Sequence, residues 1–316
     1  MRVVVVAEWC PPHLLARHLD PLPYRYHPAW AEDPIGLAAA LADARALVVR
    51  NRTPVTAALV DQAPALQVVG RLGSGLDNLD ADALSRRGIA IIAAPGENAV
   101  AVAEYVLAAI LAASRELVPA FATTRTGWER HARGRELAGQ TLVLVGLGHV
   151  GRAVAVRASA LGLVVLAYDP RLAPDHPAWA ATGARRIPRL EDALAQAQWL
   201  SLHLPAVPGQ PPLLDARRLG RLARGAHVIN TARGSLIDEG ALLAALQSGQ
   251  VSGATLDVRQ VEPPPPDDPL RCHARVQSTP HLAGLTQESQ GRIAARVLGG
   301  VRAFLHSHRP LPARSV

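Results

Sequence analysis

Residues 141–151 read TLVLVGLGHVG, an apolar run that leads directly into a glycine-rich turn. Residues 152–161 then predict a helix rich in Ala, Val and Arg, and a second apolar run occupies residues 163–167. Asp169 follows that run, so a strand, a turn, a helix, a strand and an acid succeed one another. This order is the context that a dinucleotide-binding glycine turn requires.

Each glycine of this turn has its own physical reason. Gly146 permits the tight bend after the strand, and Gly148 lets the backbone approach a pyrophosphate. Gly151 lets the helix pack closely against the strand. The backbone amides of His149 and Val150 are then expected to face phosphate from the N-terminus of the helix.

Asp169 indicates which dinucleotide binds. A carboxylate at the end of the second strand accepts hydrogen bonds from the adenosine ribose hydroxyls. Its charge would repel a 2′-phosphate, which favours NAD over NADP, although Arg171 nearby keeps NADP open as an alternative. We therefore predict NAD as the cofactor.

The position of the turn predicts a second domain. The turn lies near the middle of a 316-residue chain, so another domain is expected before it. Apolar runs alternate with helical segments up to residue 93, which predicts an α/β fold of parallel sheets covered on both faces. Residues 95–98 break this pattern before a long apolar helix over residues 99–117. We predict a substrate domain of residues 1–95 plus 285–316 and an NAD-binding domain of residues 96–284, with the last helix, 286–306, crossing back onto the first domain.

Other elements follow from the same periodicities. Strands are expected at 3–6, 46–50, 66–71, 89–93, 141–145, 163–167, 199–204, 226–230, 253–258 and 276–278, and shorter helices at 35–45, 55–63, 81–87, 152–161 and 239–248.

Composition narrows the classes of function. The formal net charge is +7, but all 33 basic residues are arginine, they are scattered, and aromatic residues make up only 3%. A GC-rich genome accounts for this composition. We therefore expect no nucleic-acid partner, although a positive field would gather a small anionic substrate. No apolar run is long enough for a membrane span or a signal peptide. Cys10 and Cys272 form neither a disulfide framework nor a metal spacing, which predicts a metal-free cytoplasmic protein.

Three later segments carry polar residues where strands end, which is where such sheets bind ligands: 230–238, 257–263 and 279–284. Reduction of a 2-oxo acid by a nicotinamide needs a cation for the carboxylate, a proton donor for the carbonyl oxygen and a carboxylate to orient that donor. Arg233, His281 and Glu262 supply these types in that order. Each residue taken alone is also compatible with a surface ion pair or a loop hydrogen bond, so the prediction rests on their joint occurrence.

The chain resembles the D-isomer-specific 2-hydroxyacid dehydrogenase family over nearly its whole length. The resemblance rests on the glycine turn with Asp169, on these three segments, and on residues 71–80, 98–104, Trp128 and 137–139. The resemblance implies a flavodoxin-like substrate domain, a Rossmann NAD-binding domain and a homodimer formed through the NAD-binding domains. It also implies Arg233 as the substrate clamp, Glu262 as the relay partner and His281 as the acid/base. Further cofactor contacts are implied at Ser74, Val102, Leu204, Pro205, Thr231, Ala232, Arg233, Asp257, His281 and Gly284.

The choice of substrate is expected to depend on the first domain. The resemblance places substrate contacts at Arg50, Asn51 and Arg52, and at the backbone of Gly73, Ser74 and Gly75, beside Arg233 and His281. The two arginines beside Asn51 suit a second anionic group, as in phosphoglycerate-, sulfolactate- or glycerate-type substrates, but are also compatible with a solvated strand end. No regulatory domain follows residue 316, which predicts a short form of the family.

Two departures and two alternatives accompany this hypothesis. Arg259-Gln260 stand where the family usually has an aromatic and an acid, and the proline run 263–266 after Glu262 is unusual. An NAD(H)-sensing binding protein, like the corepressors related to this family, would keep the same residues. A formate dehydrogenase is disfavoured because Glu262 stands where that group has an amide.

Overall fold

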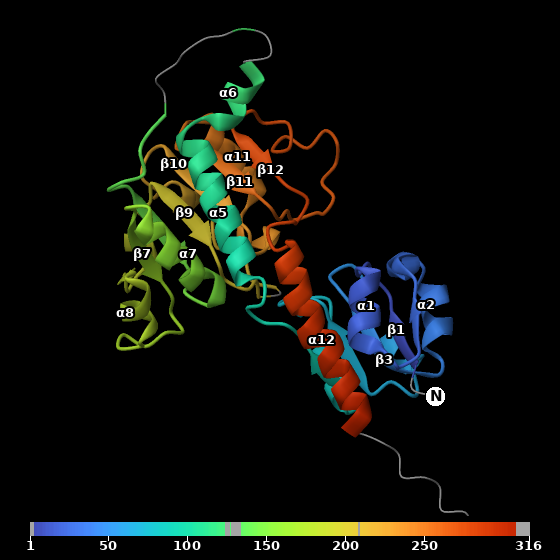
Figure 1. The fold of residues 1–316 in the computed structure, drawn as a ribbon. Helices are drawn as coiled ribbons and strands as arrows, with labels where there is room; N and C mark the ends of the chain where they lie inside the picture. The colour runs from blue at the N-terminus through green and yellow to red at the C-terminus, as the bar shows by residue number, and fades with distance from the viewer. Residues whose placement is uncertain (1–2, 124–126, 128–133, 208, 308–316) are drawn as a thin grey trace, which may run out of the picture. The chain divides into compact units, whose positions relative to one another are not determined.

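The computed structural model describes residues 3–123, 127, 134–207 and 209–307, and Trp128 lies outside the described residues. The chain forms two compact units (Figure 1). The first runs to Asn98 and resumes at Thr286, and the second is Ala99–Leu285. These boundaries lie within a few residues of those expected from the sequence.

The first unit is a five-stranded parallel sheet in the order β2-β1-β3-β4-β5, with helices on both faces. Successive valines of the first strand alternate between two cores, since Val4 and Val6 belong to one cluster and Val5 to the other. Its elements are β1 (Val3–Val6), α1 (Pro12–Leu19), β2 (Tyr24–Tyr26), η1 (Pro28–Ala31), α2 (Pro34–Leu41), β3 (Ala44–Val49), α3 (Ala57–Asp61), β4 (Val68–Arg71), α4 (Ala81–Arg86), β5 (Ala90–Ile92) and α12 (Gln287–Ser307).

The last helix, α12, returns to this unit and packs against α1 and β4. A glycine in β4 permits this approach, because a Cβ on Gly70 would meet Val297 and Val301 of α12 at 2.9 Å. Strand β4 therefore has a glycine at the point where α12 packs closely against the sheet.

The second unit is a seven-stranded parallel sheet in the order β12-β11-β10-β9-β6-β7-β8. The order reverses between β6 and β9, and the carboxyl ends of parallel strands at such a reversal form the ligand crevice of doubly wound sheets. Its elements are α5 (Ala99–Ser114), α6 (Leu117–Thr123), β6 (Thr141–Val145), α7 (His149–Ala160), β7 (Val164–Tyr168), α8 (Ala178–Thr182), β8 (Arg185–Arg186), α9 (Leu190–Leu194), β9 (Trp199–Leu202), α10 (Ala216–Leu219), β10 (Ala226–Asn230), η2 (Gly234–Leu236), α11 (Glu239–Gln247), β11 (Val251–Leu256) and β12 (Val276–Ser278).

Two expected helices end earlier than the sequence pattern indicates. The helix expected over 35–45 ends at Leu41, and Ala44 already begins β3. Alanine favours helices, but Ala44 and Ala46 are fully buried in a strand between β1 and β4, and burial overrides propensity there. The helix expected over 99–117 ends at Ser114, and Glu116 then has a φ of 49°.

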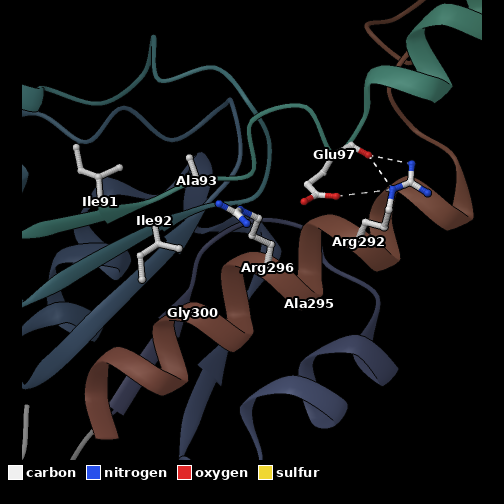
Figure 2. Close-up of a pocket in the computed structure, with 8 residues that line it drawn as sticks. All are labelled: Ile91, Ile92, Ala93, Glu97, Arg292, Ala295, Arg296 and Gly300. Atoms are coloured by element: carbon white, nitrogen blue, oxygen red, sulfur yellow. Dashed lines mark hydrogen bonds and ion pairs between the residues drawn. The ribbon is translucent and has the colours of Figure 1, made fainter. Parts of the chain in front are cut away.

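A hollow of about 670 Å³ opens in the first unit between β5 and α12 (Figure 2). Ile91 and Ile92 line it from the strand, and Arg292 of α12 donates hydrogen bonds to the Glu97 carbonyl oxygen at 2.9 and 3.1 Å. Its lining residues include none of those predicted for the cofactor or the substrate, so the candidate site is built elsewhere.

Within the described ranges, no helix combines the length and the apolar character that crossing a bilayer requires.

Candidate active site

The glycine turn lies at the reversal point of the second sheet, between β6 and α7. Gly146 has a φ of +102°, and a Cβ there would meet the His203 carbonyl oxygen at 2.6 Å, so a side chain is excluded both by conformation and by space. A Cβ on Gly151 would meet the Gly146 carbonyl oxygen at 2.2 Å. These two glycines are therefore required by the protein's own packing.

Gly148 is different, because a Cβ there would meet nothing within 4 Å. It is the N-cap of α7 and makes no side-chain capping bond, so the first amides of this helix, which starts at His149, are left for another acceptor. Across the same edge of the sheet, Thr231 Oγ1 is buried and has no hydrogen-bond partner within the described residues. Open space at a helix N-terminus and an orphaned hydroxyl fit a bound dinucleotide.

Asp169 follows β7 and is hydrogen-bonded to the glycine turn. Its carboxylate accepts hydrogen bonds from the backbone amides of Leu147 at 2.8 Å and of Arg171 at 2.9 Å. Each carboxylate oxygen keeps further acceptor capacity for ribose hydroxyls. The acid therefore ties the glycine turn to the end of β7 as well as presenting a negative charge there.

Other predicted cofactor residues follow the strands of the same sheet edge. Leu204 and Pro205 come after β9, Thr231 and Ala232 after β10, and Asp257 after β11, whereas Gly284 closes the loop after β12. Val102 lies in α5 and packs in the core cluster with α7, so its cofactor contact stays a prediction.

Glu262 and His281 form a hydrogen-bonded pair, with His281 Nδ1 2.8 Å from Glu262 Oε2. About a third of each side chain is exposed, 38% for His281 and 35% for Glu262, so the pair is within reach of a ligand. Burial raises the pKa of Glu262, but hydrogen bonds from His281 and the Arg259 amide, with the charges of His281 and Arg233, lower it overall. The carboxylate is therefore held ionised beside the imidazole.

The loop that carries His281 is fastened to Asp257. The buried Asp257 carboxylate accepts hydrogen bonds from Thr279 Oγ1 at 2.6 Å and from the amides of Leu282 at 2.8 Å and Ala283 at 2.9 Å. The Asp257 carbonyl oxygen also accepts from the His281 amide at 2.9 Å. One acid after β11 thus fixes the backbone on both sides of His281.

Tyr105 of α5 extends this arrangement. Its hydroxyl lies 2.6 Å from Thr279 Oγ1, and Thr279 already donates its only proton to Asp257, so Tyr105 must be the donor. Burial raises the pKa of Tyr105, which keeps this donor proton in place. A helix more than 170 residues earlier in the chain therefore supports the His281 loop.

Arg233 stands at the start of the turn after β10. Asn230 braces this turn, because its side chain accepts from the Ala232 amide at 3.0 Å and donates to the Arg233 carbonyl oxygen at 2.9 Å. Arg233 Nη1 donates to the Ala232 carbonyl oxygen at 2.6 Å. A Cβ on Gly234 would meet the Arg259 carbonyl oxygen at 2.0 Å, so the turn that begins at Arg233 lies directly against the segment that leads to Glu262.

In the first unit, the buried carboxylate of Glu8 shapes the predicted substrate loop. It accepts hydrogen bonds from the backbone amides of Arg50 at 2.8 Å, Arg52 at 3.1 and 3.2 Å, and Thr53 at 2.9 Å. Arg50 also packs over the Trp9 ring, and Arg52 pairs with Glu32. Asn51 is exposed between them. The Glu8 carboxylate therefore holds the backbone of this loop, and binding of a second anionic group by its side chains stays a prediction.

The glycine segment 73–75 follows β4. Gly73 has a φ of +156°, and Ser74 Oγ donates toward the Ala94 carbonyl oxygen and Asn98 Oδ1, each at 3.0 Å. Gly75 directly follows Ser74. Substrate binding by these backbone amides stays a prediction.

Comparison with known proteins identifies the family. The D-isomer specific 2-hydroxyacid dehydrogenase NAD binding domain matches residues 107–283. The chain belongs to this family. The second unit, which carries the glycine turn, is therefore its NAD-binding domain.

Several relatives within the 2-hydroxyacid dehydrogenases are similar along most of the chain. D-3-phosphoglycerate dehydrogenase of Mycobacterium tuberculosis is 40% identical over 307 residues, which is 96% of this chain and 57% of that protein. The human D-3-phosphoglycerate dehydrogenase is 40% identical over 263 residues, 83% of this chain and 49% of its own length. The chain thus spans about half the length of the curated relatives it matches.

Solved structures of the family agree with the fold. The TT0316 protein of Thermus thermophilus superposes with a TM-score of 0.87 at 32% identity and covers 98% of both chains. A glyoxylate reductase from Paecilomyes thermophila gives a TM-score of 0.84 at 26% identity and covers 99% of both chains.

Some residues that support the candidate site are not indicated by the sequence pattern. Tyr105 stands in a long apolar helix and Glu8 just after the first strand, and nothing adjacent in the chain marks their partners. A polar residue at the end of an otherwise apolar strand, as at Glu8, is the signal that points to such a role. Arg259 departs from the family pattern, but its neighbours in the chain do not indicate its partners Glu239 and Asp268.

Proposed function

We propose that this protein is an NAD-dependent D-2-hydroxyacid dehydrogenase that interconverts a 2-oxo acid and the corresponding 2-hydroxy acid. The observation that carries the proposal is the 2.8 Å pair of His281 and Glu262, placed where the charge of Arg233 reaches the same carboxylate. A cation, a proton donor and an ionised partner are the groups that carbonyl reduction needs.

The residues divide the work as follows. Arg233 binds the substrate carboxylate and draws electron density toward the carbonyl oxygen with its planar guanidinium. When bound, NADH supplies the hydride that C2 of the 2-oxo acid accepts. His281 gives a proton to the oxygen as the alkoxide develops, and Glu262 stabilises the charged imidazole and sets its orientation. In the reverse direction, His281 accepts the hydroxyl proton.

The proposal extends to the substrate class. The relatives that match over most of this chain are D-3-phosphoglycerate dehydrogenases, and two arginines flank Asn51 at the end of β3. We propose a 2-hydroxy acid with a second anionic group, of the phosphoglycerate, sulfolactate or glycerate type. A panel of glyoxylate, hydroxypyruvate, phosphohydroxypyruvate and sulfopyruvate ranks these possibilities.

We also propose a homodimer in the cytoplasm. The outer faces of α5 and α6 expose Leu111, Leu117 and Val118 near one another in sequence, which is the kind of apolar surface that a partner subunit covers. Cys10 is buried and Cys272 exposed, and both are free thiols, as a reducing compartment allows.

The decisive experiment is His281→Ala, assayed with NADH and the 2-oxo acid panel. Loss of the general acid should lower kcat by about 10²- to 10⁴-fold with NADH affinity retained. His13→Ala, at an exposed histidine of α1, is the matched control. Turnover within a few-fold of wild type would remove His281 from the mechanism. Tight NADH binding without turnover of any 2-oxo acid by the wild type would favour the NAD(H)-sensing alternative.

A further inference from the structure

We propose that Arg259 is a positioning residue that holds Glu262 in place for His281 through a buried ion triad with Glu239 and Asp268. This inference rests on the proposed dehydrogenase function. It assigns a role to the arginine that replaces the family's usual aromatic residue after β11.

The triad is formed by side chains from three separate segments. Arg259 Nε and Nη2 donate to the two carboxylate oxygens of Glu239 at 2.9 Å each, which is a bidentate fork. Nη2 also donates to Asp268 Oδ1 at 2.9 Å. Only 3% of the Arg259 side chain is exposed, so these contacts lie away from solvent screening.

Arg259 holds the Glu262 segment at both of its ends. Its backbone amide donates to Glu262 Oε1 at 3.0 Å, the carboxylate oxygen that does not face His281. Its side chain meanwhile holds Asp268, on the far side of the proline run 263–266. Because proline restricts φ, the segment between these two anchors has few conformations to lose. The arginine at position 259 and the proline run thus act together to restrict the segment that carries Glu262.

The same residue connects Glu262 with the turn of Arg233. A Cβ on Gly234 would meet the carbonyl carbon and oxygen of Arg259 at 2.0 Å, so the two backbones are in direct contact there. The neighbouring Gln260 adds hydrogen bonds from its amide to Glu239 Oε1 at 2.9 Å and from Nε2 to the Ile237 carbonyl oxygen at 2.7 Å. Strand β11 and helix α11, which carry these loops, pack against each other (Figure 1).

Stability by itself does not account for this arrangement. Buried ion pairs are often no more stabilising than apolar residues of similar volume, such as the aromatic that the family uses here. Arg259 Nη1 is also buried without a hydrogen-bond partner among the described residues, which adds a desolvation penalty. What the arginine provides, and an aromatic cannot, is a directional link from Glu239 and Asp268 to the loop of Glu262.

The test is a double-mutant cycle of Arg259→Met and Glu262→Gln, with kcat and KM measured on the best 2-oxo acid. Misplacing Glu262 by about 1 Å should lower kcat by about 10²-fold with little change in KM. In the Glu262→Gln background, Arg259→Met should have little further effect, because the group it positions is already gone. Arg259→Lys should restore part of kcat. Asp268→Asn, which keeps the Glu239 fork, gives a milder variant should Arg259→Met fold poorly.

Arg218→Met is the matched control, because Arg218 forms a partly buried pair with Glu191 in the same unit. It should keep the wild-type kcat. Equal fold-losses from Arg259→Met in the wild-type and Glu262→Gln backgrounds would overturn the proposal, since Arg259 would then act independently of Glu262.

A second readout does not depend on turnover. Amide hydrogen exchange of the intact protein should show lost protection at residues 259–262 in Arg259→Met and none in Arg218→Met. Unchanged protection there would also overturn the positioning role. A wild type that turns over no 2-oxo acid would contradict the proposed function alone, and the exchange result would still decide the role of Arg259.

Discussion

His281 shows what this fold demands of a single residue. It has a φ of 54°, a left-handed conformation that histidine adopts more readily than most side chains but still against a steric penalty. The surrounding backbone imposes it, because the Asp257 carboxylate binds the amides of Leu282 and Ala283 directly after it. The imidazole is thereby directed to Glu262 by the backbone rather than by its own rotamer preference alone.

Glu262→Gln should make the protein less sensitive to acid. Its folded-state pKa lies below the usual 4.5, because the hydrogen bonds and positive charges around it outweigh burial, which acts in the opposite direction. The carboxylate therefore stabilises the fold above about pH 4.5, and this stabilisation is lost as the pH falls through the folded-state pKa. Urea unfolding from about pH 7 down to about pH 3 should show a shallower loss of unfolding free energy in Glu262→Gln than in wild type.

Glu104→Gln, at an exposed glutamate of α5, serves as the control and should keep the wild-type pH dependence. Identical pH dependence in wild type and Glu262→Gln would contradict the prediction.

Among the elements of the second unit, the glycine turn between β6 and α7 contains glycines needed for two different reasons, packing of the protein and access for a ligand. The sequence pattern alone does not distinguish the two. Gly151 is needed by the protein, because its Cα faces the Gly146 carbonyl oxygen. Gly148 faces open space and is needed only where something else approaches the helix N-terminus. One turn thus contains a folding glycine and a binding glycine.

Substitution by alanine should distinguish them. Gly151→Ala forces a Cβ to 2.2 Å from a carbonyl oxygen, so β6 and α7 must separate and Tm should fall by several degrees. Gly148→Ala should leave Tm within a degree or two, since its φ of −74° suits alanine, and should weaken NADH binding by at least about ten-fold. Thermal unfolding without cofactor and NADH fluorescence titration measure the two effects. NADH affinity unchanged in Gly148→Ala would place the pyrophosphate elsewhere.

At the scale of the whole molecule, the two units have matched designs. Each is a parallel sheet covered on both faces, and each buries two clusters of apolar side chains. The chain passes from the first unit to the second after Asn98 and returns after Leu285, so the first strand and the last helix belong to the same unit. The apolar residues left on the outside of the second unit are then the candidates for assembly.

Val118→Glu tests that assembly. Val118 is 50% exposed on α6, beside Leu117 at 37%, and Leu111 on α5 is 40% exposed. A charge placed there should convert the proposed dimer to a monomer, because an unpaired carboxylate is costly to bury in an interface. Sedimentation velocity measures the molecular mass. Ile35→Glu, at an 84% exposed position of the first unit, should stay dimeric. A wild type that sediments as a monomer would remove the homodimer proposal.

Features that depend only on neighbouring residues can be predicted from the amino-acid sequence. The glycine turn, the apolar strands and the polar segments at their ends are local, because a turn's backbone conformation and a strand's burial pattern are written in consecutive residues. Arg233, Glu262 and His281 were predicted on that basis, and the family assignment was confirmed. Short edge strands such as β2 and β8, of three and two residues, carry too little pattern to be recognised.

The contacts that hold the glycine turn and the catalytic loops depend on the tertiary structure. The partners of Arg259 lie 20 residues before it and 9 after it, and Tyr105 meets Thr279 across 174 residues. Such pairings are set by the order of strands in the sheet, which brings the ends of β10, β11 and β12 to one edge. The sequence shows which kinds of group a charged or hydroxyl side chain is able to bind. The fold determines which of those groups lies within its reach.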